Sequence, residues 1–280
     1  MASINPSVTI APSGPSVPTV SIGFIGFGAM AQGIATGMVR HGGIDGAQIM
    51  AYDINADMLA SATAALGATA AQNASEVVDN SEFVILAVKP NVIESVVEPI
   101  KGKLADEGTT VISIAWGWDY ARYEQILAEG THHLSIVPNT PIAVGKGVVV
   151  AERKNNLTPD EIAEFTKLFS PISLVEFLDT ATLYQAGTVT SCAPAYAAMF
   201  IEALSDAAVK HGIPRAAAYR LVSAMVEGTG ALQVATGQIP AAMKDAVCSP
   251  GGATIRGVQR LEERGFRGDV MSAVDAVMGD

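Results

Sequence analysis

The sequence has few of the features that mark disulfide-bonded, zinc-binding or membrane-spanning proteins. Its 280 residues include only two cysteines, Cys192 and Cys248, which excludes a disulfide framework, and no Cys or His spacing suggests zinc. No uninterrupted apolar run approaches the roughly 20 residues that span a bilayer. The 17 basic residues are outnumbered by 28 acidic ones, and the net charge of −11 argues against a nucleic-acid-binding surface. We therefore expect a cytoplasmic protein without nucleic-acid or membrane partners.

Basic residues are also missing from the N-terminal segment, where the first one is Arg40. The basic region of a secretory signal or a transit peptide is therefore not expected here. Residues 1–19 instead carry prolines among serine and threonine. We expect a mobile tail over residues 1–19.

Short apolar runs rich in β-branched residues alternate with helical segments from Val20 onward. The strand-like runs cover residues 20–27, 48–54, 82–88, 109–115, 133–138, 147–152 and 173–179. Helices are expected at residues 29–41, 56–66 and 92–104, and another begins at Thr158, which is followed by Pro159. This alternation predicts an α/β domain with a Rossmann-like, doubly wound parallel sheet over residues 20–179.

The composition changes after Asp179. Residues 180–201 contain no charge, and the following sequence is rich in alanine, with helices expected at 215–236, 241–247, 252–263 and 269–278. The uncharged stretch carries too many polar groups for lipid, so we interpret it as a helix buried at a subunit or domain interface. Residues 180–280 are thus expected to form an all-helical domain, and the protein to be a homodimer or larger.

A glycine-rich turn joins the first expected strand to the first expected helix. It consists of Gly26, Phe27, Gly28, Ala29, Met30 and Ala31. In this G-x-G-x-x-A pattern the first glycine makes the tight turn, the second lets a diphosphate approach the backbone, and the alanine permits close helix packing. N–H groups at the helix start favour a diphosphate, which predicts a dinucleotide site. A glycine-rich turn without a ligand is the alternative.

Asp53 ends the second expected strand, 22 residues after Ala31. An acid about 20 residues beyond the motif accepts hydrogen bonds from the adenosine ribose. Its charge would repel a 2′-phosphate, and no Lys or Arg lies between Arg40 and Lys89 to offset it. The residues therefore favour NADH over NADPH, and a surface acid that contacts nothing is the alternative.

Two further groups of residues carry weaker signals. Ala87, Val88, Lys89 and Pro90 follow a buried strand, so they are expected at the carboxyl edge of the sheet, where Lys89 faces either cofactor or solvent. The sequence shows no evident acid or serine partner for His132 and His133. We interpret them as ordinary loop histidines rather than a catalytic dyad.

A second turn lies near the C-terminus, where Ser249, Pro250, Gly251 and Gly252 precede a helical segment that starts at Ala253. Several backbone N–H groups can converge there on one carboxylate, and the hydroxyl of Thr254 lies close by. A helix–helix turn with glycine for geometry is the alternative.

Five blocks together resemble the pyrroline-5-carboxylate reductase family over nearly the whole chain from Val20. They are IGFIGFGAMA (22–31), LAVKP (86–90), VPNTP (137–141), PAYAAMFIEAL (194–204) and KDAVCSPGGATI (244–255). The resemblance implies an NAD(P)H-binding domain followed by a helical domain that forms dimers. It also implies reduction of the cyclic imino acid Δ1-pyrroline-5-carboxylate to L-proline, the last step of proline biosynthesis.

The resemblance also assigns site residues. It places the dinucleotide on residues 26–31, Asn73, residues 87–90 and Ala115. It places the substrate carboxylate near Ser249, Gly251, Gly252 and Ala253, with Thr254 close to the ring nitrogen as the catalytic residue.

The sequence departs from the family pattern near the expected nicotinamide site. Trp116 and Trp118 stand where small or aliphatic residues are usual, and the run at residues 190–193 is not the usual Ser/Gly-rich one. A β-hydroxyacid dehydrogenase is one alternative, but neither Lys210 nor Lys244 follows the glycine-rich turn that such an enzyme needs. A nucleotide-sensing regulatory protein without catalysis is the other.

Overall fold

The computed structural model describes residues 20–106 and 108–279, so the tail expected at residues 1–19 lies outside the described residues. The chain divides into two compact units between Tyr184 and Gln185. The expected domain boundary after Asp179 falls close to this division, because α8 begins at Thr180 and its first turn belongs to the first unit.

The first unit contains an eight-stranded sheet in the order β3-β2-β1-β4-β5-β6-β7-β8. The strands are β1 (Ile22–Ile25), β2 (Ile49–Tyr52), β3 (Thr69–Ala70), β4 (Phe83–Leu86), β5 (Thr110–Ser113), β6 (His132–Pro138), β7 (Gly147–Glu152) and β8 (Ser173–Leu178). Neighbouring strands from β3 to β6 are parallel, which confirms the doubly wound fold. The departure is β7, which pairs antiparallel with β6 and parallel with β8.

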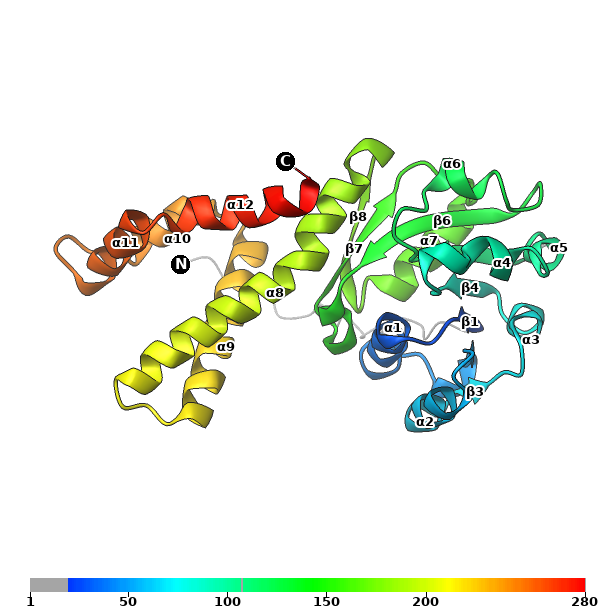
Figure 1. Ribbon diagram of the computed structural model, residues 1–280, viewed down its shortest axis with the longest axis horizontal. Coiled ribbons are helices and arrows are strands. Elements are labelled where there is room, and N and C mark those ends of the chain that lie inside the picture. The colour runs from blue at the N-terminus through cyan, green and yellow to red at the C-terminus, as the bar shows by residue number, and fades with distance from the viewer. Residues whose placement is uncertain (1–19, 107, 280) are drawn as a thin grey trace, which may run out of the picture. The chain divides into compact units, whose positions relative to one another are not determined.

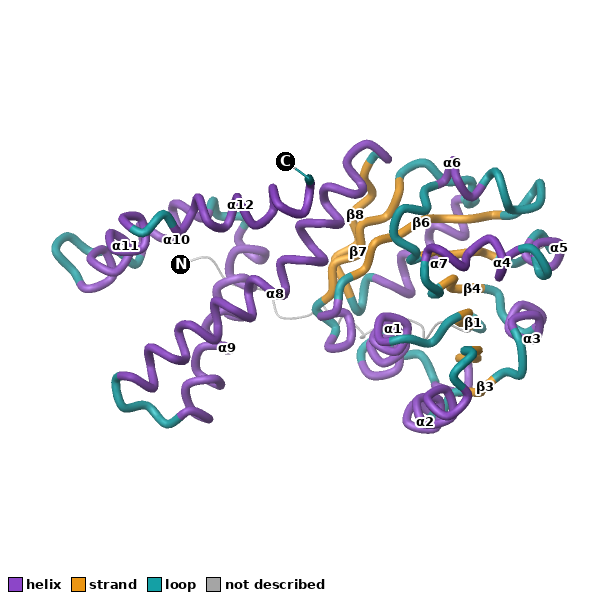
Figure 2. Tube along the Cα trace, viewed as in Figure 1, coloured by secondary structure: helices purple, strands orange, loops and turns teal. Residues whose placement is uncertain are grey.

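Helices cover both faces of this sheet (Figures 1 and 2). They are α1 (Ala29–Arg40), α2 (Ala56–Leu66), α3 (Ala74–Asp79), α4 (Ile93–Val97), α5 (Lys101–Leu104), α6 (Tyr120–Tyr123) and α7 (Pro159–Phe169). Short 3₁₀ helices are η1 (Gly46–Gln48), η2 (Pro90–Val92) and η3 (Thr140–Val144). One core cluster joins Phe24 to Met38 of α1 and Phe165 of α7. The other joins Val84 to side chains of α3 to α6, such as Val97. Burial on both faces explains why the strands are almost continuously apolar.

Most expected elements of the first unit are confirmed, but the helix expected at residues 92–104 is wrong. It is divided into α4 and α5, because Pro99 has no N–H group to continue a helix. The sequence analysis also missed β3, α3 and α6. These elements are only two to six residues long, too short to show a hydrophobic period.

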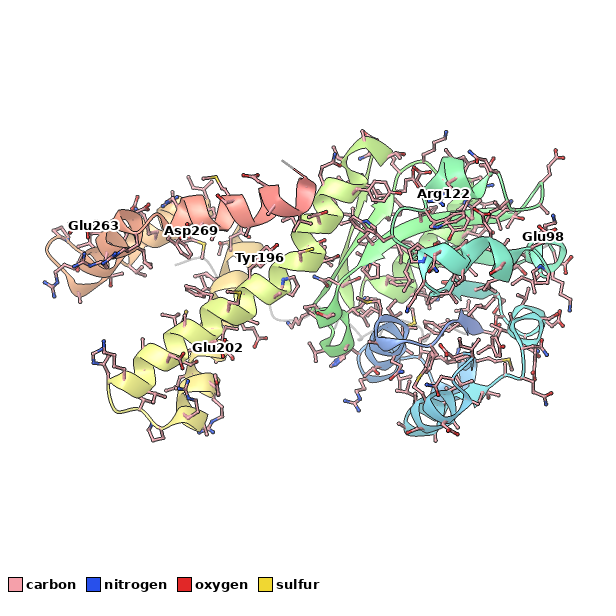
Figure 3. All side chains as sticks on the ribbon, viewed as in Figure 1. Glu98, Arg122, Tyr196, Glu202, Glu263 and Asp269 are labelled. Atoms are coloured by element: carbon pink, nitrogen blue, oxygen red, sulfur yellow. The ribbon has the colours of Figure 1, made fainter. Side chains whose placement is uncertain are left out.

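Helices joined by short loops make up the second unit, which has no strand within residues 185–279 (Figure 2). It holds most of α8 (Thr180–Lys210), followed by α9 (Arg215–Thr236), α10 (Pro240–Ala246), α11 (Ala253–Glu263) and α12 (Phe266–Met278). The hydroxyl of Tyr196, labelled on α8 in Figure 3, donates to the carbonyl oxygen of Ala273 on α12 over 3.2 Å. By length and composition α8 could cross a membrane. Only 6% of its most apolar 18-residue segment is buried.

Candidate functional site

The glycine-rich turn between β1 and α1 leaves backbone N–H groups open to a ligand. Gly26 has φ of +88°, and a Cβ there would come within 2.8 Å of the carbonyl group of Ala87, so only glycine fits. A Cβ on Gly28, by contrast, would meet no atom within 4 Å. Gly28 caps α1 without a side-chain hydrogen bond, so the first turn of α1 presents its N–H groups to an approaching anion.

Asp53 lies directly beside this turn. Its Oδ2 accepts a hydrogen bond from the N–H of Phe27 over 2.7 Å, and its Oδ1 accepts one from the N–H of Asn55 over 2.9 Å. A carboxylate has about four acceptor sites, so both oxygens retain lone pairs for ribose hydroxyls. The alternative of an acid that contacts nothing is therefore wrong.

The segment after β4 reaches the same edge of the sheet. The N–H of Ala87 donates to the carbonyl oxygen of Ile25 over 2.8 Å, which sets this segment against the glycine turn. Lys89 is exposed and forms no ion pair with any residue that the structure describes. Asn73 caps α3, and its side chain accepts from the N–H of Glu76 over 2.9 Å. Its role toward a cofactor stays a prediction.

The two tryptophans after β5 differ in burial, because Trp116 is exposed to solvent and Trp118 is buried. Trp118 is buried, its Nε1 donates to the carbonyl oxygen of Pro90 over 3.0 Å, and the guanidinium carbon of Arg122 lies 3.9 Å from its ring centre. Arg122 is labelled on α6 in Figure 3. The segments at residues 87–90 and at Ala115, both assigned to the cofactor, are thus tied together by Trp118. Sequence reasoning missed this link, because Pro90 and Trp118 meet only in the folded chain.

A buried carboxylate that the sequence analysis also missed binds the segment that follows these tryptophans. Glu152, at the end of β7, accepts hydrogen bonds from the N–H of Tyr120 over 2.7 Å and from the hydroxyl of Thr180. Burial raises the pKa of Glu152, although these two hydrogen bonds oppose the shift. The signal in the sequence was a single acid at the end of an otherwise apolar strand.

Tyr184, in the first turns of α8, lies close to this carboxylate. Burial raises the pKa of Tyr184 to about 12, and nearby Asp119 and Glu152 add to the shift. Its buried hydroxyl has no hydrogen-bond partner among the described residues. The ring packs edge-to-face on Trp116, with centres 5.3 Å apart.

The two histidines correct an expectation from the sequence, since each has an acidic partner. Nδ1 of His132 lies 2.8 Å from Oε1 of Glu161, and Nε2 of the buried His133 lies 2.9 Å from Oε1 of Glu124. Burial lowers the pKa of His133. Both residues belong to β6 rather than to a loop. They start that strand, at its amino end, whereas the glycine turn follows the carboxyl end of β1.

The second unit carries the turn that the resemblance assigns to the substrate. Gly251 has φ of +67°, which favours glycine, and a Cβ on Gly252 would lie 2.4 Å from Oγ and 3.0 Å from the carbonyl oxygen of Ser249, so the turn is tightly packed at Gly252. Gly252 caps α11 without a side-chain hydrogen bond. Thr254 lies exposed in the first turn, and its hydroxyl has no hydrogen-bond partner in the described part of the chain. The N–H of Gly252 donates to the carbonyl oxygen of Ser249 over 3.0 Å within the turn. The N–H groups in the first turn of α11 have no intrahelical acceptor, and together with the Thr254 hydroxyl they can bind a carboxylate.

A doubly wound sheet with this glycine turn and this acid defines a nicotinamide-dinucleotide-dependent oxidoreductase, here joined to a helical unit. Comparisons with known proteins agree. The family model described as NADP oxidoreductase coenzyme F420-dependent matches residues 21–117. The model described as pyrroline-5-carboxylate reductase dimerisation matches residues 181–279.

Whole-chain relatives identify the family. Pyrroline-5-carboxylate reductase of Treponema pallidum is 43% identical over 263 residues, covering 92% of this chain and 99% of that protein. The Escherichia coli enzyme is 35% identical, covering 92% and 95%. Among solved structures, the Coxiella burnetii reductase has a TM-score of 0.81 at 27% identity, covering 92% and 96%. The Plasmodium falciparum reductase with NADP bound has a TM-score of 0.79 at 26% identity, covering 92% and 95%. This chain belongs to the pyrroline-5-carboxylate reductase family.

Proposed function

We propose that this protein reduces Δ1-pyrroline-5-carboxylate to L-proline at the expense of a reduced nicotinamide dinucleotide. One observation carries the proposal. This chain is related over 92% of its length to a pyrroline-5-carboxylate reductase. It has both a glycine turn beside Asp53 and a Ser249–Gly252 turn, and the second turn starts α11 without a side-chain cap. The first suits a dinucleotide and the second a carboxylate.

The residues at the sheet edge fit the dinucleotide. Open N–H groups at the start of α1 would hold the diphosphate, and Asp53 would hold the adenosine ribose. When bound, the reduced nicotinamide supplies a hydride to the electrophilic carbon of the protonated imine. The protein mainly positions the two rings, and Ala87–Pro90 and Ala115 are assigned to that task.

Asp53 further favours NADH as the cofactor. Its carboxylate already lies at the glycine turn, and a 2′-phosphate on the ribose would bring a second negative charge to this position. Lys89 is the nearest basic residue that follows it in the sequence, and it stands after a different strand. A family relative has NADP bound in its crystal structure, so this preference would be a property of the present chain.

The turn before α11 is assigned to the imino acid. The turn of Ser249, Gly251, Gly252 and Ala253 would bind its carboxylate through its N–H groups, except that of Gly252, which donates to the carbonyl oxygen of Ser249. Thr254 would hydrogen-bond to the ring nitrogen, which gains an electron pair as the imine is reduced, with solvent as the final proton source.

We further propose that the protein acts in the cytoplasm as a homodimer or larger assembly. A dimerisation model matches the helical unit, and that unit exposes many large apolar side chains.

One assay tests the reaction. Purified protein should oxidise NADH or NADPH, followed by loss of nicotinamide absorbance, when Δ1-pyrroline-5-carboxylate is added, with L-proline as the product. Oxidation of a β-hydroxyacid with NAD⁺ instead would identify a β-hydroxyacid dehydrogenase. Dinucleotide binding without turnover of either substrate would identify a regulatory protein.

A further inference from the structure

The order of the strands sets where each end of a dinucleotide falls along the sheet edge. Asp53 follows β2, the glycine turn follows β1, Ala87–Pro90 follow β4, and Ala115 and Trp116 follow β5. These strands are neighbours in the order β2-β1-β4-β5, so β2 and β5 lie about 14 Å apart at roughly 4.8 Å per strand. The nicotinamide lies across the diphosphate from the adenosine. With the adenosine ribose at β2 and the diphosphate at β1, the nicotinamide end extends toward β4 and β5.

Trp116 is the large side chain at that end. It is 46% exposed, whereas Trp118, two residues later, is 2% exposed. A large aromatic ring left open beside a binding segment is unusual for a residue that serves packing alone.

One ring contact and the turn that follows the ring limit the motion of this exposed side chain. The ring of Tyr184 supports it edge-to-face, with an interplanar angle of 67°. The turn behind it contains Gly117 at φ of +80°, whose carbonyl oxygen accepts a hydrogen bond from Arg122 over 3.1 Å.

Glu152 joins the two segments that carry these rings. It binds Tyr120, in the segment that follows Trp116, and Thr180, one helical turn before Tyr184. The sheet register permits this, because Ser113 of β5 pairs with Ser135 of β6, and the reversal into β7 pairs Ile136 with Ala151. Glu152 then pairs with Leu178 at the end of β8, immediately before α8. These contacts fix the two backbone segments that carry the Trp116 and Tyr184 rings and so limit the positions that the indole can take.

We propose that the Trp116 indole contacts the nicotinamide end of the bound dinucleotide and contributes to its affinity. The inference rests on the proposed use of a nicotinamide cofactor. An indole offers an apolar face to a heteroaromatic ring, and a preorganised ring loses little conformational entropy on binding. Trp116 should then stabilise the nicotinamide half of the ligand and leave the ADP-ribose half unaffected.

Calorimetric titration of the full chain with NADH and with ADP-ribose, which lacks the nicotinamide ring, separates the two halves. In Trp116→Ala we expect the Kd for NADH to rise about fivefold to thirtyfold and that for ADP-ribose to stay within twofold. Trp116→Phe keeps an aromatic face and should recover most of the affinity for NADH. Asp53→Ser acts at the other end and should weaken both ligands. Leu174→Ala, at an exposed leucine of β8, should change neither.

Two results would overturn the inference, provided circular dichroism and the melting temperature show that Trp116→Ala is folded. One is a Kd for NADH within twofold of wild type. The other is equal weakening of NADH and ADP-ribose, which would assign the indole to the shape of the loop. If Trp116→Ala does not fold, Trp116→Leu, which keeps an apolar side chain but has no aromatic face, takes its place in the same comparison. The titrations contain no imine, so failure of the wild-type reduction assay would remove the proposed function without deciding this question.

Discussion

Asp53 is the residue whose contacts bear most directly on the choice between NADH and NADPH. One oxygen accepts the Phe27 N–H, so the carboxylate is fixed at the glycine turn. A 2′-phosphate there would lose the ribose hydrogen bonds and meet a like charge, a difference of about 1 to 3 kcal/mol or about fivefold to 150-fold in affinity. We expect NADH to be at least as good a cofactor as NADPH, measured as kcat/KM for each.

Two substitutions at this position separate charge from hydrogen bonding. Asp53→Asn removes the charge but keeps an oxygen that can accept the Phe27 N–H, whereas Asp53→Ser shortens the side chain. Both should narrow or reverse the gap between the cofactors. A wild-type KM for NADPH tenfold below that for NADH would show that Asp53 does not face the ribose.

Thr254 is the residue that we propose hydrogen-bonds to the substrate nitrogen. Its hydroxyl is exposed in the first turn of α11 and has no hydrogen-bond partner in the described part of the chain, so its removal breaks no hydrogen bond there. Thr254→Ala should lower kcat/KM for the cyclic imine by about tenfold to a thousandfold, through loss of about 1.5 to 4 kcal/mol in the transition state.

The Kd for the cofactor provides the control for this change and should remain near the wild-type value. Thr254→Ser retains the hydroxyl and should retain most of the activity. Steady-state kinetics of Thr254→Ala within twofold of wild type would remove this residue from the mechanism.

At the scale of elements, α7 shows how a cap couples helix stability to pH. Glu161 accepts the Thr158 N–H over 2.6 Å in a reciprocal capping box, and it also accepts the hydroxyl of Thr110 and lies against His132. Burial acts to raise the pKa of Glu161, but hydrogen bonds from Thr158, His132 and Thr110 outweigh it and hold the pKa below its ordinary value of 4.5. The charged form therefore stabilises the fold above that pH, and this contribution is lost as the pH falls through the lowered pKa.

Glu161→Gln should accordingly reduce the free energy of unfolding by about 1 to 2 kcal/mol near neutral pH. The difference from wild type should shrink in acid, below the ordinary pKa. Glu164→Gln is the matched control. Among the described residues Glu164 forms an ion pair with the partly exposed Lys167 of the same helix and with no other residue, so this change should alter stability by less than about 0.5 kcal/mol. Denaturant unfolding at several pH values measures both, and a difference that stays constant with pH would contradict this account.

Local signals in the sequence predicted the position of many helices and strands, but they did not predict how all the strands pair in the sheet. The bounds of α2 and α9 are as expected, because each helix ends before a glycine in the left-handed conformation, Gly67 and Gly237. The reversal between β6 and β7 could not be predicted, since β7 is as apolar as the parallel strands and its direction depends on the turn at η3.

The same distinction holds for the candidate site. The glycine turn and Asp53 could be placed at one edge, because the ends of parallel strands meet there. The hydrogen bond from Trp118 to Pro90 and the contacts of Glu152 with Tyr120 and Thr180 join residues at least 28 positions apart. Such contacts depend on how loops close over the sheet, and no period or spacing in the sequence encodes them.

At the scale of the whole molecule, the helical unit of a single subunit leaves many large apolar side chains exposed, so we expect another subunit to cover them. Met199, Leu221, Val234 and Met271 are each more than 60% exposed, and α8 buries little of its apolar face. Surfaces of this kind mark sites of association. Sedimentation should therefore show a homodimer or larger species, and a stable monomer of 28.9 kDa at micromolar concentration would contradict this expectation.

A charge placed on α8 tests whether this apolar surface drives the association. Met199→Glu puts a carboxylate at a side chain that is 68% exposed in one copy, so it should be tolerated by the isolated subunit and destabilise an interface that buries it. We expect a shift toward smaller species, with the helical content retained. Ile54→Glu is the control, because Ile54 is 92% exposed on the dinucleotide-binding unit, and its sedimentation should match that of wild type. If both variants sediment like wild type, then the subunits associate through another surface and the apolar face of α8 must be covered in some other way.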